Sequence, residues 1–223
     1  MQNYEAFSDL SNPDAPVRGY LHRGTNPGAD CLILTHGAGS SCNAPLLAAL
    51  ADAFCARGLT VLRCDLPFRQ SRPHGPPSRG SAERDQAGLR AAVEAMRRLM
   101  AGCIFLGGHS YGGRQASMLA ASEQELAESL VLFSYPLHPP KQAGQLRTKH
   151  FPLLQVPTIF VHGMRDGFGT IAEMESALKL IPARTELLPV AGAGHELMTK
   201  TNRNDLIEQV ASRFAAFART AAS

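Results

Sequence analysis

The sequence predicts an α/β protein, a three-layer sandwich whose mostly parallel sheet carries crossover helices on both faces. Short continuous apolar runs alternate along the chain with longer stretches in which apolar residues recur every three or four positions. The first pattern is typical of strands buried on both faces, and the second of helices that cover them. A sheet of this kind fits 223 residues, so we expect residues 1–223 to form a single domain.

The strands and helices follow from the same two patterns. Strands are predicted over residues 31–35, 59–63, 103–106, 130–134, 158–162 and 185–190. The last of them contains Pro189, which cannot donate a ladder hydrogen bond, so it should be an edge strand. Any strands before residue 31 are less clearly marked. Helices are predicted over residues 44–56, 82–100, 113–121, 171–180 and 205–217.

Two connections are informative because of their length and composition. The connection from Pro136 to Val156 has only 21 residues, too few for an inserted helical cap domain, so the site should be open. The stretch from Asp65 to Gly80 contains four prolines and three arginines. We expect it to be a structured loop without a helix that borders the pocket.

Composition and cysteine spacing exclude several classes of function. The balance of 22 basic against 19 acidic residues gives a net charge of +3, too small a surplus for a nucleic-acid-binding surface. No apolar stretch reaches the roughly 18 residues of a membrane helix, and the N-terminus has no signal-peptide pattern, so we expect a cytoplasmic protein without a membrane partner. The five cysteines form no CxxC pair and no HExxH is present, so we expect reduced thiols and no metal.

Ser110 is the predicted nucleophile. It lies in the pentapeptide Gly108-His109-Ser110-Tyr111-Gly112, between a predicted strand and a predicted helix. A serine at the tip of so sharp a turn has a strained backbone, and the flanking glycines prevent side-chain clashes. The helix then begins directly after the serine, so its free N–H groups point to where an oxyanion would form.

A serine hydroxyl is a weak nucleophile and needs a base, which in turn needs an orienting group. Asp166 follows the strand at 158–162, and His195 follows the strand at 185–190. The carboxyl ends of parallel strands share one rim of the sheet, so these side chains can converge on Ser110 there. Asp65, which follows the second buried strand, is the rival acid. The competing bases are less well placed: His36, His109, His138, His150, His162, His22 and His74.

The oxyanion hole requires two N–H groups directed at one point. The segment Thr35-His36-Gly37-Ala38-Gly39-Ser40 follows a strand and can supply one; Ala38 is the first choice and Gly39 the second. Tyr111, directly after the nucleophile, supplies the other. The same segment can also simply cap a helix, since Ser40, Ser41 and Asn43 are good N-caps. Arg69, Arg72 and Arg79 are either a solvated surface or contacts for an anionic group on the substrate.

Four motifs together resemble the α/β-hydrolase superfamily: HGAG, GHSYGG, HGMRDGFG and GAGHEL. The resemblance covers residues 31–217, and the short chain without a cap is similar to the dienelactone-hydrolase-like group. The motifs SYPLHPP, LRTKHFPLL and DGFGT are similar to a branch that includes a hydrolase-like subunit of a histone-acetyltransferase complex. The resemblance implies Ser110 as nucleophile, Asp166 and His195 as its partners, and Ala38 with Tyr111 as oxyanion donors. Dienelactone hydrolases carry a cysteine nucleophile, whereas this chain has Ser110.

These observations predict a serine hydrolase that cleaves a carboxylic ester or thioester of a small molecule through an acyl-enzyme on Ser110. No cofactor is required for this chemistry. A binding or scaffold protein that retains the fold is one alternative. A peptidase or a carbon–carbon hydrolase with the same triad is another, because fold and triad do not determine the substrate.

Overall fold

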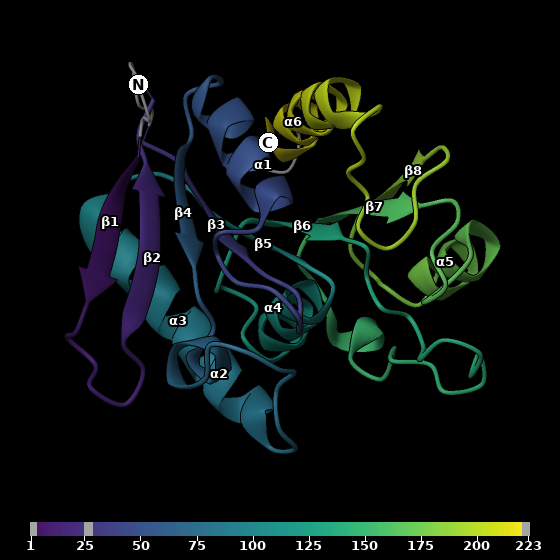
Figure 1. Ribbon diagram of the computed structural model, residues 1–223, viewed down its shortest axis with the longest axis horizontal. Coiled ribbons are helices and arrows are strands. Elements are labelled where there is room, and N and C mark those ends of the chain that lie inside the picture. The colour runs from purple at the N-terminus through teal and green to yellow at the C-terminus, as the bar shows by residue number, and fades with distance from the viewer. Residues whose placement is uncertain (1–3, 25–28, 220–223) are drawn as a thin grey trace.

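One mixed sheet organises the molecule. The computed structural model describes residues 4–24 and 29–219, and in this part of the chain eight strands form one sheet in the order β1-β2-β4-β3-β5-β6-β7-β8 (Figure 1). β1 and β2 lie antiparallel at one edge, and β2 also pairs antiparallel with β4. The remaining neighbours in the sheet are parallel: β4, β3, β5, β6, β7 and β8. The strands are β1 (Tyr4–Asp9), β2 (Val17–His22), β3 (Cys31–Thr35), β4 (Thr60–Cys64), β5 (Ile104–His109), β6 (Ser129–Phe133), β7 (Thr158–Gly163) and β8 (Thr185–Val190).

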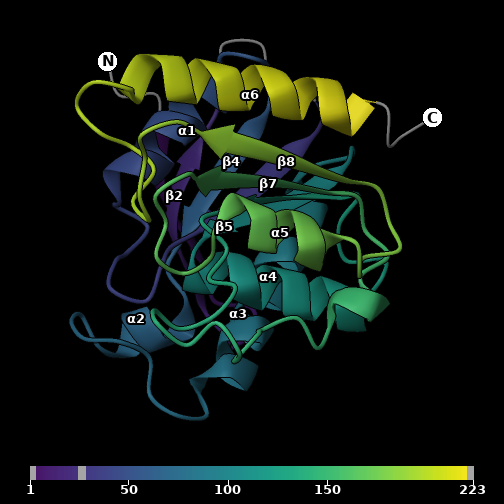
Figure 2. The ribbon, with the colours of Figure 1, turned by 90° about the vertical axis from the view of Figure 1, so that its right-hand side faces the viewer.

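Helices cover both faces of the sheet. Figure 2 shows α6 above the sheet and α5, α4 and α3 below it, and α1 packs beside α6 on the upper face. The helices are α1 (Pro45–Cys55), α2 (Pro67–Ser71), α3 (Ser81–Leu99), α4 (Tyr111–Ser122), α5 (Ile171–Leu178) and α6 (Arg203–Arg219), with a short 3₁₀ helix η1 (Phe151–Leu153). The predicted three-layer sandwich is confirmed.

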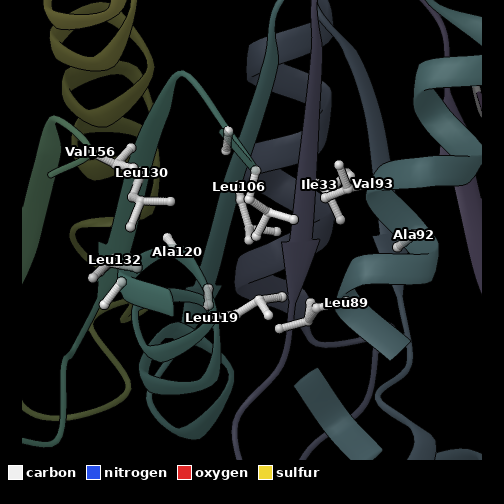
Figure 3. Packing of buried hydrophobic residues seen from close by; sticks show 14 of the residues in the cluster. Ile33, Leu89, Ala92, Val93, Leu106, Leu119, Ala120, Leu130, Leu132 and Val156 are labelled. Carbon is white, nitrogen blue, oxygen red and sulfur yellow. The ribbon is translucent and has the colours of Figure 1, made fainter. Parts of the chain in front are cut away.

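Two cores result from the alternation of side chains along each strand. In β3, Leu32 and Leu34 face α1 and α6, whereas Ile33 faces α3 and α4. Figure 3 shows the second of these cores, in which Ile33 and Leu106 meet Leu89 and Leu119 from the helices. Because β3 is apolar on both sides, it is fixed between two layers, and the rim at its carboxyl end is a rigid platform.

The six predicted strands and five predicted helices are present, with small shifts at their ends. β8, which contains Pro189, is an edge strand as expected. β1 and β2 have no clear sequence signal because β1 is only partly buried, so it lacks a continuous apolar run. The expectation that residues 65–80 contain no helix is wrong: Pro67 begins α2, where a missing N–H has no cost because the first turn has no acceptor for it.

The segment between β6 and β7 contains only η1 as regular structure, so no helical cap is inserted there. Across the residues that the structure describes, no helix combines the length and apolar character needed to cross a membrane.

Candidate active site

Ser110 lies between β5 and α4 in a strained backbone conformation. Its φ is 50° and its ψ is −114°, in a region that side-chain-bearing residues rarely adopt. Its N–H donates to the Phe133 carbonyl (2.8 Å), and its own carbonyl accepts from the N–H of Arg114 (3.0 Å). These bonds hold the turn, so the hydroxyl of Ser110 projects from the rim of the sheet.

The glycines beside Ser110 are required by close approach of the backbone. A Cβ atom on Gly108 would lie 2.7 Å from the nitrogen of Gly113, so the strand and the helix could not meet as closely. A Cβ on Gly112 would lie 2.5 Å from the carbonyl oxygen of His36. The turn therefore packs directly against the segment after β3, and only glycine permits this contact.

His195 links Ser110 to Asp166. The Nε2 atom of His195 lies 2.8 Å from the Oγ of Ser110, and its Nδ1 lies 2.8 Å from Oδ2 of Asp166. Because an ionised carboxylate only accepts, Nδ1 carries the proton and Nε2 is free to accept from Ser110. The three predicted residues, which come from the ends of β5, β7 and β8, thus form one continuous hydrogen-bonded chain.

The carboxylate of Asp166 is buried and multiply hydrogen-bonded. Burial opposes its ionisation, but hydrogen bonds from His195 and from the N–H of Phe168, together with the nearby imidazoles, outweigh that effect. The net result is that the pKa of Asp166 lies below its usual value. Asp166 is therefore a carboxylate near neutral pH and holds His195 in the tautomer described above.

Three buried histidines hold the loops that carry these groups. The Nε2 of His109 donates to the carbonyl of His195 (2.9 Å), and that of His162 donates to the carbonyl of Gly169 (2.8 Å). His36 donates from Nδ1 to the Gly37 carbonyl (2.8 Å). Burial lowers the pKa of all three. They are neutral supports for the loops, and none of them contacts the hydroxyl of Ser110.

The remaining rivals lie elsewhere. Asp65 accepts the N–H of Cys42 (2.7 Å) and lies 3.4 Å from Nε2 of His36, so it has no contact with His195. The other histidines do not contact Ser110. His22 accepts a hydrogen bond from Arg63, and His138 lies 3.5 Å from Glu173. His150 pairs with Ser117, and His74 is exposed on the loop after α2.

Residues 37–40, which we call the oxyanion loop, lie beside the nucleophile turn. A Cβ on Gly37 would be 3.4 Å from that of Ser110. The loop is a tight turn closed by the Ser40 N–H on the Gly37 carbonyl (3.1 Å), and in the described part of the chain the N–H of Ala38 donates to no protein acceptor. The N–H of Tyr111 is in the first turn of α4, where no intrahelical acceptor exists. Both predicted donors are thus free beside Ser110.

A cleft of about 630 Å³ opens over Ser110 and His195. The oxyanion loop borders it, and the other lining residues are largely apolar. Glu196 is an exposed acidic group at its edge. The ring of Phe168 stacks on that of His195 at 4.2 Å. The apolar lining consists of Ala44, Pro45, Leu46, Leu47, Phe168 and Met198.

The predictions for residues 65–80 need correction at the site. None of these residues lines the cleft, so the expectation that this stretch borders the pocket is wrong. Arg69 is neither solvated nor directed at a substrate, because it is buried and donates to backbone carbonyls. Arg72 and Arg79 are exposed. Within residues 4–24 and 29–219, no three His, Cys, Asp or Glu side chains are grouped in a way that could hold a metal ion.

Comparison with known proteins identifies the family. A family model described as "Alpha/beta hydrolase domain" matches residues 28–221, which is most of the chain. The chain belongs to the α/β-hydrolase family. The motifs from which this relationship was expected lie at the nucleophile turn, the oxyanion loop and the turns after β7 and β8.

Several solved structures match this one over nearly its whole length. A dienelactone hydrolase from Anabaena variabilis is 19% identical, with a TM-score of 0.74 over 96% of this chain and 99% of that one. Est1E from Butyrivibrio proteoclasticus is 17% identical, with a TM-score of 0.74 and the same coverage. A serine hydrolase without a lid from Xanthomonas campestris is 18% identical, with a TM-score of 0.72 over 96% and 95%. These similarities show the shared fold, and the narrower resemblance to the histone-acetyltransferase-associated branch stays a prediction.

The sequence did not indicate the roles of three residues of this α/β-hydrolase site. Phe168 stacks on His195, Arg69 supports the oxyanion loop, and Asp85 accepts a hydrogen bond from the hydroxyl of Tyr111 (2.7 Å). Phe168 lies within the motif HGMRDGFG, which was used only for Asp166, whereas Arg69 and Asp85 belong to none of the four motifs. For Asp85, the signal available was its position on the apolar face of α3, where a carboxylate is unexpected.

Proposed function

We propose that this protein is a serine hydrolase that cleaves a carboxylic ester or thioester through an acyl-enzyme on Ser110. The observation that carries the proposal is the chain Ser110 Oγ to His195 Nε2 to Asp166, with 2.8 Å at both steps. The strained φ of Ser110, the apolar cleft above it and the two free N–H groups beside it support the same chemistry.

Acylation begins when Nε2 of His195 takes the hydroxyl proton of Ser110 as the oxygen attacks the substrate carbonyl. The negative charge moves to the carbonyl oxygen, which accepts hydrogen bonds from the N–H groups of Ala38 and Tyr111. Asp166 stabilises the imidazolium that forms. The intermediate then collapses: the bond to the leaving group breaks, His195 returns the proton to that group, and the acyl group remains on Ser110.

Deacylation repeats these steps with water as the nucleophile. Nε2 of His195 takes a proton from a water molecule, and the resulting oxygen attacks the acyl carbonyl. The second tetrahedral intermediate uses the same two N–H donors, and its collapse returns the proton to Ser110. The carboxylic acid leaves and the enzyme is restored, so no cofactor or metal is needed for the cycle.

The cleft favours an uncharged acyl group. Its walls are formed by Leu46, Leu47, Phe168 and Met198, and no lysine or arginine is among its described lining residues. Glu196 at the edge would repel an anionic substituent. We therefore propose short, neutral acyl esters or thioesters as the substrate class. Because the cleft lining includes none of Arg69, Arg72 and Arg79, the structure does not support a role for these arginines in recognising an anionic substrate group.

The alternatives are less well supported. A binding or scaffold protein would not need a serine held at a positive φ within hydrogen-bond reach of an imidazole, since such strain is destabilising and persists mainly at functional sites. A peptidase or carbon–carbon hydrolase would use the same side chains. These activities belong in the substrate panel that tests the proposal.

A fluorophosphonate probe tests the proposal directly because it reacts with serines that a base and an oxyanion hole activate. We expect one adduct, mapped by mass spectrometry to Ser110, and its loss in His195→Ala. The matched control is His150→Ala, which breaks the pair of His150 with Ser117 (2.9 Å) away from the cleft and should leave labelling unchanged. A folded protein without any adduct and without turnover of short acyl esters or thioesters would favour the scaffold alternative.

A further inference from the structure

The guanidinium of Arg69 lies behind the oxyanion loop, away from the cleft. The residue is only 6% exposed, and no carboxylate of the described residues forms an ion pair with it. Its Nε donates to the carbonyl of Ser40 (2.6 Å) and its Nη2 to that of Ala38 (2.9 Å). Two further bonds reach the carbonyls of Arg72 and Gly75. A buried cation without a counter-ion is unfavourable, so its presence here points to a role beyond packing.

The hydrogen bond from Arg69 to the carbonyl of Ala38 determines the direction of the N–H of Gly39. In a trans peptide the C=O and the N–H point in opposite directions, and the described residues contain no cis peptide. Because the carbonyl of Ala38 faces Arg69, the N–H of Gly39 points away from Arg69. The carbonyl of Gly37 is held by His36, which directs the N–H of Ala38 away from His36. Residues 37–40 line the cleft, whereas Arg69 and His36 do not, so both N–H groups face the cleft side.

The charge of Arg69 also strengthens the N–H of Gly39 as a hydrogen-bond donor. A hydrogen bond from a guanidinium to a carbonyl is charge-assisted and polarises the peptide unit that accepts it. The peptide between Ala38 and Gly39 therefore carries a more positive N–H, and this N–H belongs to Gly39, the second choice of donor, and not to Ala38. An arginine is suited to this task because its planar fork reaches both carbonyls at once, which a lysine ammonium on a flexible stem cannot reproduce.

The helix that carries Arg69 also contacts the second predicted donor. The N–H of Phe68, the neighbouring residue on α2, donates to Oδ1 of Asp85 (3.0 Å). The other oxygen of Asp85 accepts the hydroxyl of Tyr111 (2.7 Å), and the rings of Phe68 and Tyr111 pack edge to face. Through α2 and Asp85, Arg69 is thus connected to the residue whose own N–H faces the same oxyanion.

We propose that Arg69 is a positioning residue that holds and polarises the oxyanion loop from behind. It fixes the loop relative to Tyr111, and it stabilises the transition state without contacting the substrate. The inference rests on the proposed function, because it assigns Arg69 to the same acyl-transfer site.

The test compares Arg69→Met and Arg69→Lys with Gln70→Met. Gln70 is the next residue on α2, and its amide donates to the carbonyls of Pro16 (2.8 Å) and Asp65 (2.9 Å), so its loss also removes two backbone contacts of the same helix but leaves the oxyanion loop untouched. For a short acyl ester, we expect Arg69→Met to lower kcat by roughly 10- to 100-fold with little change in KM, because loss of a whole donor costs about 10²- to 10³-fold. Arg69→Lys should be intermediate, and Gln70→Met should retain kcat.

Nuclear magnetic resonance provides a readout that does not need turnover. The amide resonances of Ala38 and Gly39 should shift in Arg69→Lys and remain in place in Gln70→Met. Equal losses of kcat in Arg69→Met and Gln70→Met would overturn the proposal, as would a normal kcat in a folded Arg69→Met. If Arg69→Met does not fold, kcat and the resonances of Arg69→Lys decide the question. If the wild-type protein itself shows no turnover, the proposed function fails, and unshifted resonances in Arg69→Lys would separately overturn the role of Arg69.

Discussion

Among the described residues, two serine–histidine pairs have almost equal hydrogen-bond lengths but very different surroundings. Ser110 Oγ lies 2.8 Å from Nε2 of His195, and Ser117 Oγ lies 2.9 Å from Nε2 of His150. Both serines belong to the same turn and helix, one at the start of α4 and the other two turns later. The distance between serine and histidine therefore says little about chemistry, and the difference must lie in what surrounds each pair.

The second pair lacks every other part of the site. Ser117 is fully buried in a regular helix, and its hydroxyl has a competing acceptor in the carbonyl of Arg114 (3.0 Å). Burial and, to a smaller extent, the cation of Arg114 lower the pKa of His150, and in the described part of the chain no carboxylate pairs with it. His195, in contrast, is oriented by Asp166 and opens to a cleft. Activation requires the acid, the free N–H groups and access, as well as the base.

The largest expected effect is a loss of turnover that distinguishes Ser110 from Ser117. Ser110→Ala should lower turnover of a short acyl ester by roughly 10⁴- to 10⁶-fold, because the acyl-enzyme can no longer form. Ser117→Ala should leave turnover essentially unchanged. Far-ultraviolet circular dichroism of both variants confirms folding. Ordinary activity in Ser110→Ala would show that Ser110 is not the nucleophile. The two serine–histidine pairs would then not differ in catalytic role.

Removal of the acid should make the first pair more like the second. In Asp166→Asn the amide cannot hold the Nδ1–H tautomer of His195, so turnover should fall by about 10³- to 10⁴-fold. Asp65→Asn is the matched control, because Asp65 accepts from Cys42 and lies near His36 rather than His195. Steady-state kinetics should show a much milder loss there, and a reversed ranking would transfer the role of acid to Asp65.

Loss of one N–H donor from the oxyanion loop should lower kcat by a smaller factor. Ala38→Pro deletes one N–H without touching the three side chains and should lower kcat by about 10²- to 10³-fold. Ala38→Ser keeps the N–H and should be close to wild type. Equal impairment of both variants would mean that the loop matters for packing rather than for the oxyanion.

The same contrast explains which features the sequence predicted. Ser110 and Asp166 each follow a strongly apolar parallel strand, and His195 follows the edge strand β8. Their convergence on one rim could therefore be predicted from the positions of the strands. The role of Arg69 could not be predicted, because its partners are backbone carbonyls. Every residue has a carbonyl, so a sequence does not show which of them an arginine contacts. The strands before residue 31 were only vaguely marked because the partly exposed edge strand β1 has no continuous apolar run. Side chains that perform chemistry are visible in a sequence, whereas the backbone that supports them is not.

The single domain was expected over residues 1–223, of which residues 1–3, 25–28 and 220–223 lie outside the described residues. The roles of the site residues, the ester or thioester substrate and the cytoplasmic location stay predictions. The experiments above address the roles and the substrate first because both depend on the state of Ser110.

The smallest expected effect concerns stability and uses the pKa of His150. Burial, with a smaller contribution from the charge of Arg114, lowers the pKa of His150 to about 4. In the unfolded chain the same imidazole titrates near its ordinary value of about 6.5. Between these values the unfolded state binds more protons than the folded state, so the free energy of unfolding must fall as the pH is lowered from about 6.5 towards 4.

His150→Gln should remove this contribution while keeping a donor near the position of Nε2 that faces Ser117. Each such histidine contributes a slope of up to about 1.4 kcal/mol per pH unit, so the variant should lose stability less steeply on acidification than the wild type. Urea unfolding at pH 7, 6 and 5 measures the slope. Turnover at pH 7 should be unaffected, because the pair lies outside the cleft. An unchanged slope would mean that His150 is already protonated in the folded protein near pH 6. In that case Ser117 would face a cation, and the two pairs would differ in the charge of the imidazole as well as in their surroundings.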